Sequence, residues 1–122
     1  MGNVLIVDDS STMRKIISRS LRQAGLQVDD IYEAADGIEG LSVMEGKTID
    51  LILSDINMPN MDGLELLNRL KASATWQKVP VVMITTEGSQ ARVMEAVGLG
   101  AAGYVRKPFT ADQIKEKIIS LL

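Results

Sequence analysis

The sequence predicts an α/β protein in which helices cover both faces of a parallel sheet. Two observations lead to this prediction. Short runs rich in β-branched residues alternate strictly with segments whose apolar residues recur at helical spacing. Signals that start and end helices fall between these segments. Because the chain has 122 residues and shows no linker or repeat, we expect one domain over residues 1–122.

Five short apolar runs are the candidate strands. Most of them are continuous, which is typical of strands that are buried on both faces of a parallel sheet. The runs are Val4–Val7, Val28–Tyr32, Leu51–Leu53, Val79–Ile84 and Tyr104–Val105.

Five segments between and after these runs are the candidate helices, because their apolar residues lie three or four positions apart. We expect the fifth helix to end at the last residue. The apolar positions are Met13, Ile16, Ile17, Leu21 and Ala24; Ile38, Leu41 and Met44; Leu66, Leu67 and Leu70; Val93, Ala96 and Val97; and Ala111, Ile114, Ile118 and Leu121.

Polar residues and glycines mark the expected ends of the helices. Three candidate N-caps are each followed three residues later by Glu or Gln, which is the capping-box pattern. We expect three glycines to end helices. The N-caps with their partners are Asp36 with Glu39, Asp62 with Glu65, and Thr110 with Gln113, and the glycines are Gly25, Gly46 and Gly100.

The composition excludes several classes of function. The chain has 13 Lys plus Arg, 16 Asp plus Glu, a net charge of -3, and neither cysteine nor histidine. An acidic chain offers little attraction to nucleic acid or to an anionic membrane. Thiol chemistry, disulfides, histidine-based catalysis and thiolate or imidazole metal sites are excluded, which leaves oxygen ligands for a metal. No apolar run approaches the ~18 residues of a membrane span and no signal peptide is evident, so we expect a cytoplasmic protein.

Polar residues follow four of the five predicted strands: Asp8-Asp9, Asp55, Thr85-Thr86 and Arg106-Lys107-Pro108. In parallel α/β sheets, ligands bind at the carboxyl ends of the strands, so we expect these residues to meet at one edge of the sheet and form a site. Two unit charges 4 Å apart interact by ~4 kcal/mol at an effective dielectric constant of 20, so clustered carboxylates need cations. Lys107 provides one. The remaining oxygen ligands suit Mg²⁺ together with a phosphate group, which predicts a phosphoryl site.

These residues resemble the receiver domain of two-component response regulators. Three further segments, Ser11–Lys15, Asn57–Gly63 and Gly103–Val105, resemble the single-domain chemotaxis regulators of the CheY type. The resemblance implies a flavodoxin-like (βα)5 fold, which is a doubly wound five-stranded parallel sheet with strand order 2-1-3-4-5.

The resemblance also implies a role for each residue of the site. Asp55 would be the phosphoacceptor, since a carboxylate with a pKa near ~3.9 is ionised at pH 7 and needs no general base. The metal ligands for Mg²⁺ would be Asp9, Asp55 and the backbone carbonyl of Asn57, with Asp8 acting mostly through water. The Thr85 hydroxyl and Lys107 would contact the phosphoryl oxygens, and Thr85 with Tyr104 would form the switch.

Partners follow from the same resemblance. The phosphodonor would be a histidine kinase of the CheA type, and small donors such as acetyl phosphate would also serve. Output would be binding to a flagellar motor switch protein of the FliM type through helix four, strand five and helix five, and a phosphatase would end the signal. The protein would be a signalling switch that catalyses its own phosphorylation and dephosphorylation.

Two alternatives remain beside this interpretation. One is a phosphorelay intermediate that passes the phosphoryl group to a second histidine protein. The other is a free-standing phosphatase that uses Asp55 covalently. That enzyme would need a D-x-D motif after the first strand, and Asp8-Asp9-Ser10 lacks this spacing.

Residues near the acceptor bear on the lifetime of the phosphoryl group. Asn57 and Glu87 stand two positions beyond the acceptor and the switch hydroxyl, where they would flank and orient the attacking water. We therefore expect fast hydrolysis. Thr86 is bulkier than the alanine usual in the family, so it would narrow this path. Ser10 and Ile56 also depart from the CheY pattern, which has aromatic residues at these two positions.

Overall fold

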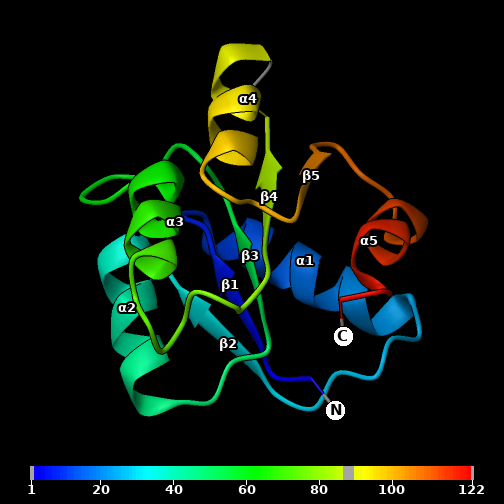
Figure 1. Ribbon diagram of the computed structural model, residues 1–122. Coiled ribbons are helices and arrows are strands. Elements are labelled where there is room, and N and C mark those ends of the chain that lie inside the picture. Colours follow the sequence, from blue (N-terminus) through cyan, green and yellow to red (C-terminus); the bar gives the residue numbers. More distant parts are fainter. Residues whose placement is uncertain (1, 87–89, 122) are drawn as a thin grey trace.

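The computed structural model describes residues 2–86 and 90–121 and contains alternating strands and helices (Figure 1). The strands are β1 (Val4–Val7), β2 (Ile31–Ala34), β3 (Leu51–Ser54), β4 (Val81–Thr85) and β5 (Gly103–Arg106). The helices are α1 (Ser11–Gln23), α2 (Gly37–Gly46), α3 (Gly63–Lys71), α4 (Gln90–Gly98) and α5 (Ala111–Ile118).

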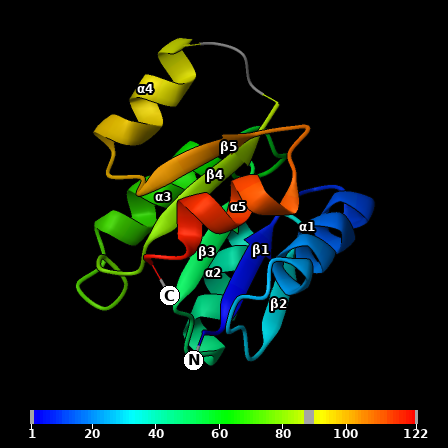
Figure 2. The ribbon, with the colours of Figure 1, turned by 90° about the vertical axis from the view of Figure 1, so that its right-hand side faces the viewer.

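The five strands form one parallel sheet in the order β2-β1-β3-β4-β5, which confirms the predicted doubly wound, flavodoxin-like fold. Helices α2, α3 and α4 lie on one face of the sheet, and α1 and α5 lie on the other (Figures 1 and 2). Two apolar clusters fill the spaces between sheet and helices. Every residue of β1 and β4 is buried, as the continuous apolar runs predicted.

The second strand lies further along the chain than predicted, at Ile31–Ala34 instead of Val28–Tyr32. The backbone explains the difference. Val28 donates its N–H to Leu26 O at 2.9 Å in a local turn, so it takes no part in the ladder. Pairing with β1 begins with Val4 opposite Ile31. The apolar residues before Ile31 pack against the core from a loop.

Strand β4 begins at Val81 instead of Val79, because Pro80 has no N–H to donate to the ladder. The carbonyl of Pro80 still accepts a hydrogen bond of 3.0 Å from Ile52 N–H on β3. At the other end β4 includes Thr85, one residue more than predicted. The fifth helix ends at Ile118 and does not continue to the last residue.

The predicted N-caps are confirmed: Asp36, Asp62 and Thr110 each accept a hydrogen bond from the backbone N–H three residues later. Among these three, the reciprocal bond that completes a capping box forms at Thr110 alone. Gly25 and Gly100 follow α1 and α4 with positive φ angles of 73° and 103°. Gly46 was predicted to play the same part, but it is the last residue of α2.

The helices of the described ranges are too short or too polar to cross a membrane.

Candidate functional site

Three carboxylates meet at the carboxyl edge of the sheet, as the sequence predicted. Asp8 and Asp9 follow β1 and Asp55 follows β3, and one oxygen of each lies within 4.8 Å of the others. The exposed fractions are 1% for Asp8 and 9% for Asp55, whereas Asp9 is exposed. The cluster therefore consists of two buried carboxylates and one that is exposed to solvent.

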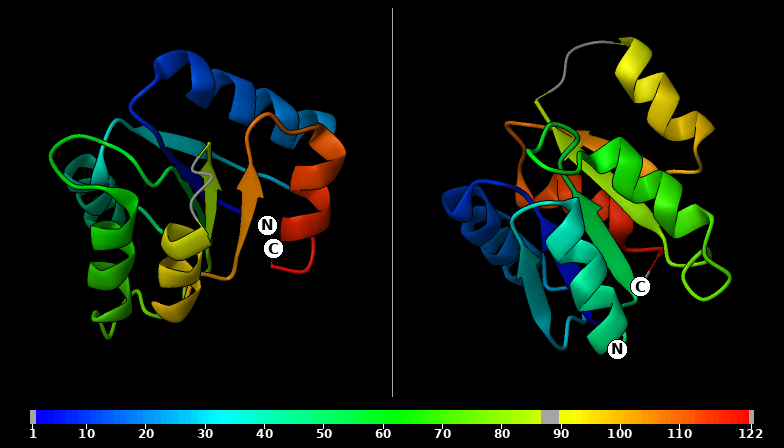
Figure 3. Two further views of the ribbon diagram at one scale, coloured as in Figure 1. Left: turned by 90° about the horizontal axis from the view of Figure 1, so that it is seen from above. Right: turned by 90° about the vertical axis from the view of Figure 1, so that its left-hand side faces the viewer.

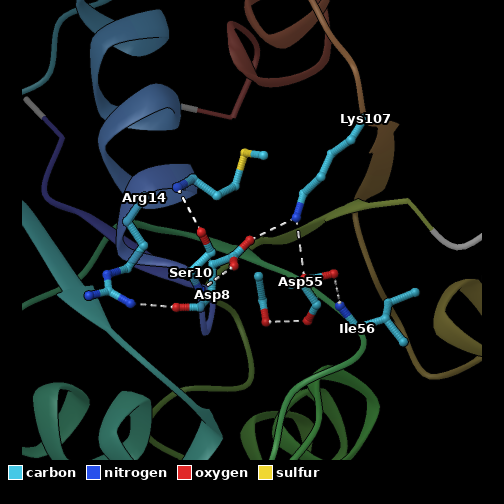
Figure 4. A network of polar contacts seen from close by, with 8 residues as sticks. Asp8, Ser10, Arg14, Asp55, Ile56 and Lys107 are labelled. Atoms are coloured by element: carbon cyan, nitrogen blue, oxygen red, sulfur yellow. Dashed lines mark hydrogen bonds and ion pairs between the residues drawn. The ribbon is translucent and has the colours of Figure 1, made fainter.

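Lys107 reaches into this cluster from the end of β5 (Figure 4). Its Nζ lies 2.8 Å from Asp8 Oδ2 and 3.3 Å from Asp55 Oδ2. Its backbone N–H donates to Thr85 O at 2.9 Å, which ties the end of β5 to the end of β4. One ammonium thus bridges two of the three carboxylates.

The environment changes the proton affinity of both partners of this ion pair. Burial raises the pKa of the Asp55 carboxyl, and the neighbouring charge of Asp8 adds to this effect, while Lys107 opposes it. Burial by itself would lower the pKa of the Lys107 ammonium, but the hydrogen bond to Asp8 and the charge of Asp55 outweigh it and raise that pKa. Lys107 therefore stays protonated at neutral pH, and the acids would gain from a second cation.

The donor set suits a hard divalent cation. Oxygen atoms of three carboxylates lie together, and the chain has no histidine or cysteine that would favour a softer metal. A divalent ion would also offset the repulsion that remains among three negative charges beside one ammonium. The residues therefore fit Mg²⁺.

Backbone groups hold the two buried carboxylates in place. Ser10 N–H donates to Asp8 Oδ1 at 2.9 Å, and Ile56 N–H donates to Asp55 Oδ1 at 2.7 Å. Arg14 donates to the backbone carbonyl of Asp8 at 2.6 Å and also pairs with Glu33 at 2.8 Å. These bonds fix the acids against the ends of β1 and β3 (Figure 4).

Sequence reasoning missed the parts played by Ser10 and Arg14. Ser10 is the N-cap of α1, and its Oγ accepts from Met13 N–H at 3.1 Å. A serine just before a helical pattern is a signal that could have found this cap. The contact between Arg14 and Asp8 depends on how α1 lies against β1, which the sequence does not reveal.

Gly63, the first residue of α3, packs directly against the backbone of Asp55. A Cβ at this position would clash with the carbonyl oxygen of Asp55 and would lie 2.8 Å from the Met83 side chain. The close approach requires glycine. It also places the Gly63 N–H within 2.8 Å of Ile56 O, which closes the base of the loop between β3 and α3.

The residues predicted to act as a switch lie on the other side of the site. Thr85 is fully buried at the end of β4, and the next residue, Thr86, is exposed. Tyr104 on β5 is 37% exposed, and its ring centroid lies 5.9 Å from Lys117 Nζ on α5. Tyr104 and Lys117 line a groove of about 390 Å³ between β5 and α5.

The residues proposed to tune the lifetime are described only in part. Asn57 is exposed in the loop after β3, two positions beyond Asp55. Glu87 lies outside the described residues.

Comparison with known proteins identifies the family. The sequence model of the family described as "Response regulator receiver domain" matches residues 4–119. A chemotaxis protein CheY homolog of Campylobacter jejuni (strain 81-176) is 40% identical over 120 residues, which are 98% of this chain and 91% of the relative.

Solved structures agree with this match. The chemotaxis protein CheY4 of Vibrio cholerae superposes with a TM-score of 0.88 at 34% identity, covering 100% of this chain and 99% of that one. A putative response regulator of Chloroflexus aurantiacus gives a TM-score of 0.89 at 27% identity, covering 98% and 96%. With the family model, the relative and the fold in agreement, the chain belongs to the response regulator receiver domains and resembles their CheY-like chemotaxis members.

Proposed function

We propose that this receiver domain is activated by phosphorylation of Asp55 by a histidine kinase of the CheA type. The observation that carries the proposal is the contact of 3.3 Å between Asp55 Oδ2 and Lys107 Nζ inside a cluster of carboxylates. This arrangement offers a nucleophilic carboxylate beside a fixed positive charge, at the edge of the sheet where ligands bind in this class of fold.

The chemistry of the transfer follows from these groups. An oxygen of Asp55 attacks phosphorus, the bond between phosphorus and the imidazole nitrogen of the donor breaks, and that nitrogen keeps the electron pair. Lys107 and the Thr85 hydroxyl stabilise the charge on the phosphoryl oxygens. Lys107 favours the ionised form of Asp55, against the effect of burial, and an ionised carboxylate attacks without a histidine of this chain as a base.

Mg²⁺ would be held by Asp9, Asp55 and the backbone carbonyl of Asn57, and by Asp8 through water. When bound, the ion supplies positive charge that neutralises the acids and the phosphoryl oxygens. Lys107 remains necessary beside it, since the ammonium already contacts Asp55 Oδ2 and would be close to a phosphoryl group on this carboxylate.

Output would occur on the surface made by α4, β5 and α5, with a flagellar motor switch protein of the FliM type as the partner. A new charge on Asp55 would draw Thr85 toward it and change the position of Tyr104. Exposed apolar side chains on this surface support the proposal, since Met94 and Val97 on α4 are 59% and 50% exposed. A phosphatase would return the domain to its resting state.

The acceptor is tested by phosphorylation from acetyl phosphate with Mg²⁺, measured as intact mass. Asp55→Asn should abolish the incorporation of phosphate. Lys107→Ala should keep some incorporation, because Mg²⁺ still screens the charge, but should uncouple it from the surface change. Full stoichiometric, base-labile phosphorylation of Asp55→Asn would show that another residue is the acceptor.

The output is tested by comparing the partners bound with and without beryllium fluoride, a mimic of the phosphoryl group. Binding of a flagellar switch protein only with the mimic supports the chemotaxis role. Transfer of phosphate from the phosphorylated chain to a second histidine protein would favour a phosphorelay.

A further inference from the structure

The loop between β3 and α3, residues 56–62, directly follows the phosphoacceptor and carries Asn57. Burial holds only part of it, since Asn57, Pro59 and Asn60 are exposed. Its far end lies beside the first turn of α2, a segment more than 20 residues earlier in the sequence (Figure 3). Hydrogen bonds to that segment are therefore important for fixing the loop.

Two hydrogen bonds join the loop to α2. Gly37 N–H donates to Met61 O at 3.0 Å. Asn60 Nδ2 donates to Asp36 Oδ2 at 2.7 Å, and we call this second bond the Asp36–Asn60 anchor. The anchor is a contact between side chains, so substitutions can remove it while the backbone bond remains.

Both residues of the anchor are constrained in other ways. Asp36 is 7% exposed, and its Oδ1 accepts from Glu39 N–H at 2.9 Å as the N-cap of α2. The bond to Glu39, and then the bond to Asn60, lower the pKa of the Asp36 carboxyl. Asn60 has a φ angle of 66°, in the left-handed region that Asn and Asp tolerate better than most residues. The anchor therefore joins the start of α2 to the one loop residue with a left-handed backbone among residues 56–62.

We propose that Asp36 and Asn60 are positioning residues which fix the 56–62 loop so that the carbonyl of Asn57 is preorganised to bind Mg²⁺. This inference rests on the proposed function, because Asn57 is taken as a metal ligand. Ordering a flexible loop costs conformational free energy. A loop that is already held in place avoids this cost when the ion binds, which strengthens binding.

The test measures the dissociation constant of Mg²⁺ for the unphosphorylated protein, from amide shifts in ¹⁵N–¹H spectra. Asn60→Asp keeps a residue that tolerates the positive φ but faces the Asp36 carboxylate with another carboxylate, so the anchor breaks. We expect Mg²⁺ to bind five- to tenfold more weakly. Simple electrostatics predicts the opposite, since the added negative charge would attract the ion.

Exchange of the two side chains provides the rescue. In the double variant Asp36→Asn with Asn60→Asp, the amide of residue 36 can donate to the carboxylate of residue 60, and the net charge equals that of the original chain. We expect the Mg²⁺ affinity to return to within twofold of the original. Asp36→Ser gives a third variant, because serine keeps the helix cap but cannot also hold Asn60, and it should bind Mg²⁺ as weakly as Asn60→Asp.

Thr110→Ala is the control for the loss of a cap alone. It removes the N-cap of α5, far from the loop in the sequence, so it should lower the stability while leaving the Mg²⁺ affinity unchanged. If Thr110→Ala weakens Mg²⁺ binding as much as Asp36→Ser does, general loss of stability explains the effect and the anchor has no positioning role.

Asp9→Asn separates failure of this inference from failure of the proposed metal site. If Asp9→Asn weakens Mg²⁺ binding but Asn60→Asp does not, the metal site stands and the positioning role of the anchor is wrong. If neither change affects Mg²⁺ binding, both the metal site and the positioning role are wrong.

Discussion

The β1–β3 side of the site and the β4–β5 side are built differently. On the first side, all four residues of β1 and of β3 are buried, and backbone N–H groups hold the carboxylates of Asp8 and Asp55. On the second side, β4 is also fully buried, but β5 buries Val105 alone. Helix α4 next to it buries two residues within the bounds Gln90–Gly98.

The difference corresponds to two requirements of a phosphorylation switch, a fixed site for the chemistry and a surface that can change. Phosphoryl transfer requires acids that are held in fixed positions. A surface that changes on activation needs elements with few buried apolar contacts, because such elements open and shift at low free-energy cost. The two strands that carry the acids are fully buried, whereas the proposed output surface includes α4 and β5, which bury few of their residues.

The largest expected effect is on stability. Leu53 on β3 is 1% exposed, so Leu53→Ala should lower the free energy of unfolding by about 2–5 kcal/mol through lost burial and a cavity. Met94 on α4 is 59% exposed, so Met94→Ala should change it by less than about 0.5 kcal/mol. Urea unfolding followed by circular dichroism measures both. Equal losses in the two variants would contradict the contrast between the two sides.

The next effect concerns the lifetime of the phosphoryl group. Asn57 lies in the loop after β3, two positions beyond Asp55. Asn57→Lys should obstruct the water that attacks the phosphoryl group and slow dephosphorylation tenfold or more, which is about 1.4 kcal/mol in the barrier. Glu87→Lys should act in the same direction. The measurement is the decay of the phosphorylated mass after the donor is removed.

Thr86, on the β4 side, provides the competing influence on that lifetime. Thr86→Ala would widen the path of the attacking water and speed the loss of the phosphoryl group. If this change exceeds the slowing caused by either lysine, the β4 side controls access of water to the site. The comparison between the two sides would then extend from packing to kinetics.

The smallest expected effect is a stabilisation of α4, which buries only Val93 and Ala96 within its bounds. Gly98 is the last residue of α4, and a Cβ there would meet no atom within 4 Å. Gly98→Ala should therefore raise the free energy of unfolding by about 0.5–1 kcal/mol, since alanine has the higher helix propensity. Hydrogen exchange of the α4 amides should slow accordingly. Unchanged or faster exchange would mean that the local stability of α4 does not depend on its helix propensity.

The sequence predicted the parts of the site that topology controls. Asp8, Asp55 and Lys107 follow strands, and parallel strands end at one edge, so the order of the elements along the chain is enough to infer their meeting. The boundaries of β2 could not be inferred in this way, because Val28 and Ile31 are equally apolar and only the pairing with β1 distinguishes them. The Asp36–Asn60 anchor was also missed, since it joins residues from separate loops and depends on the bend at Asn60.

The tight packing at Gly63 has a consequence for anyone who diversifies this sequence. Even an alanine there would force the carbonyl oxygen of Asp55 to move, since its Cβ would clash with that atom. Gly46 and Gly103, by contrast, have open space around the place of a Cβ. A library that varies all three positions should retain only glycine at 63 among clones selected for phosphorylation, while side chains enter freely at the other two. In this chain of 122 residues, the absence of a side chain at position 63 therefore limits which variants of the sequence can remain functional.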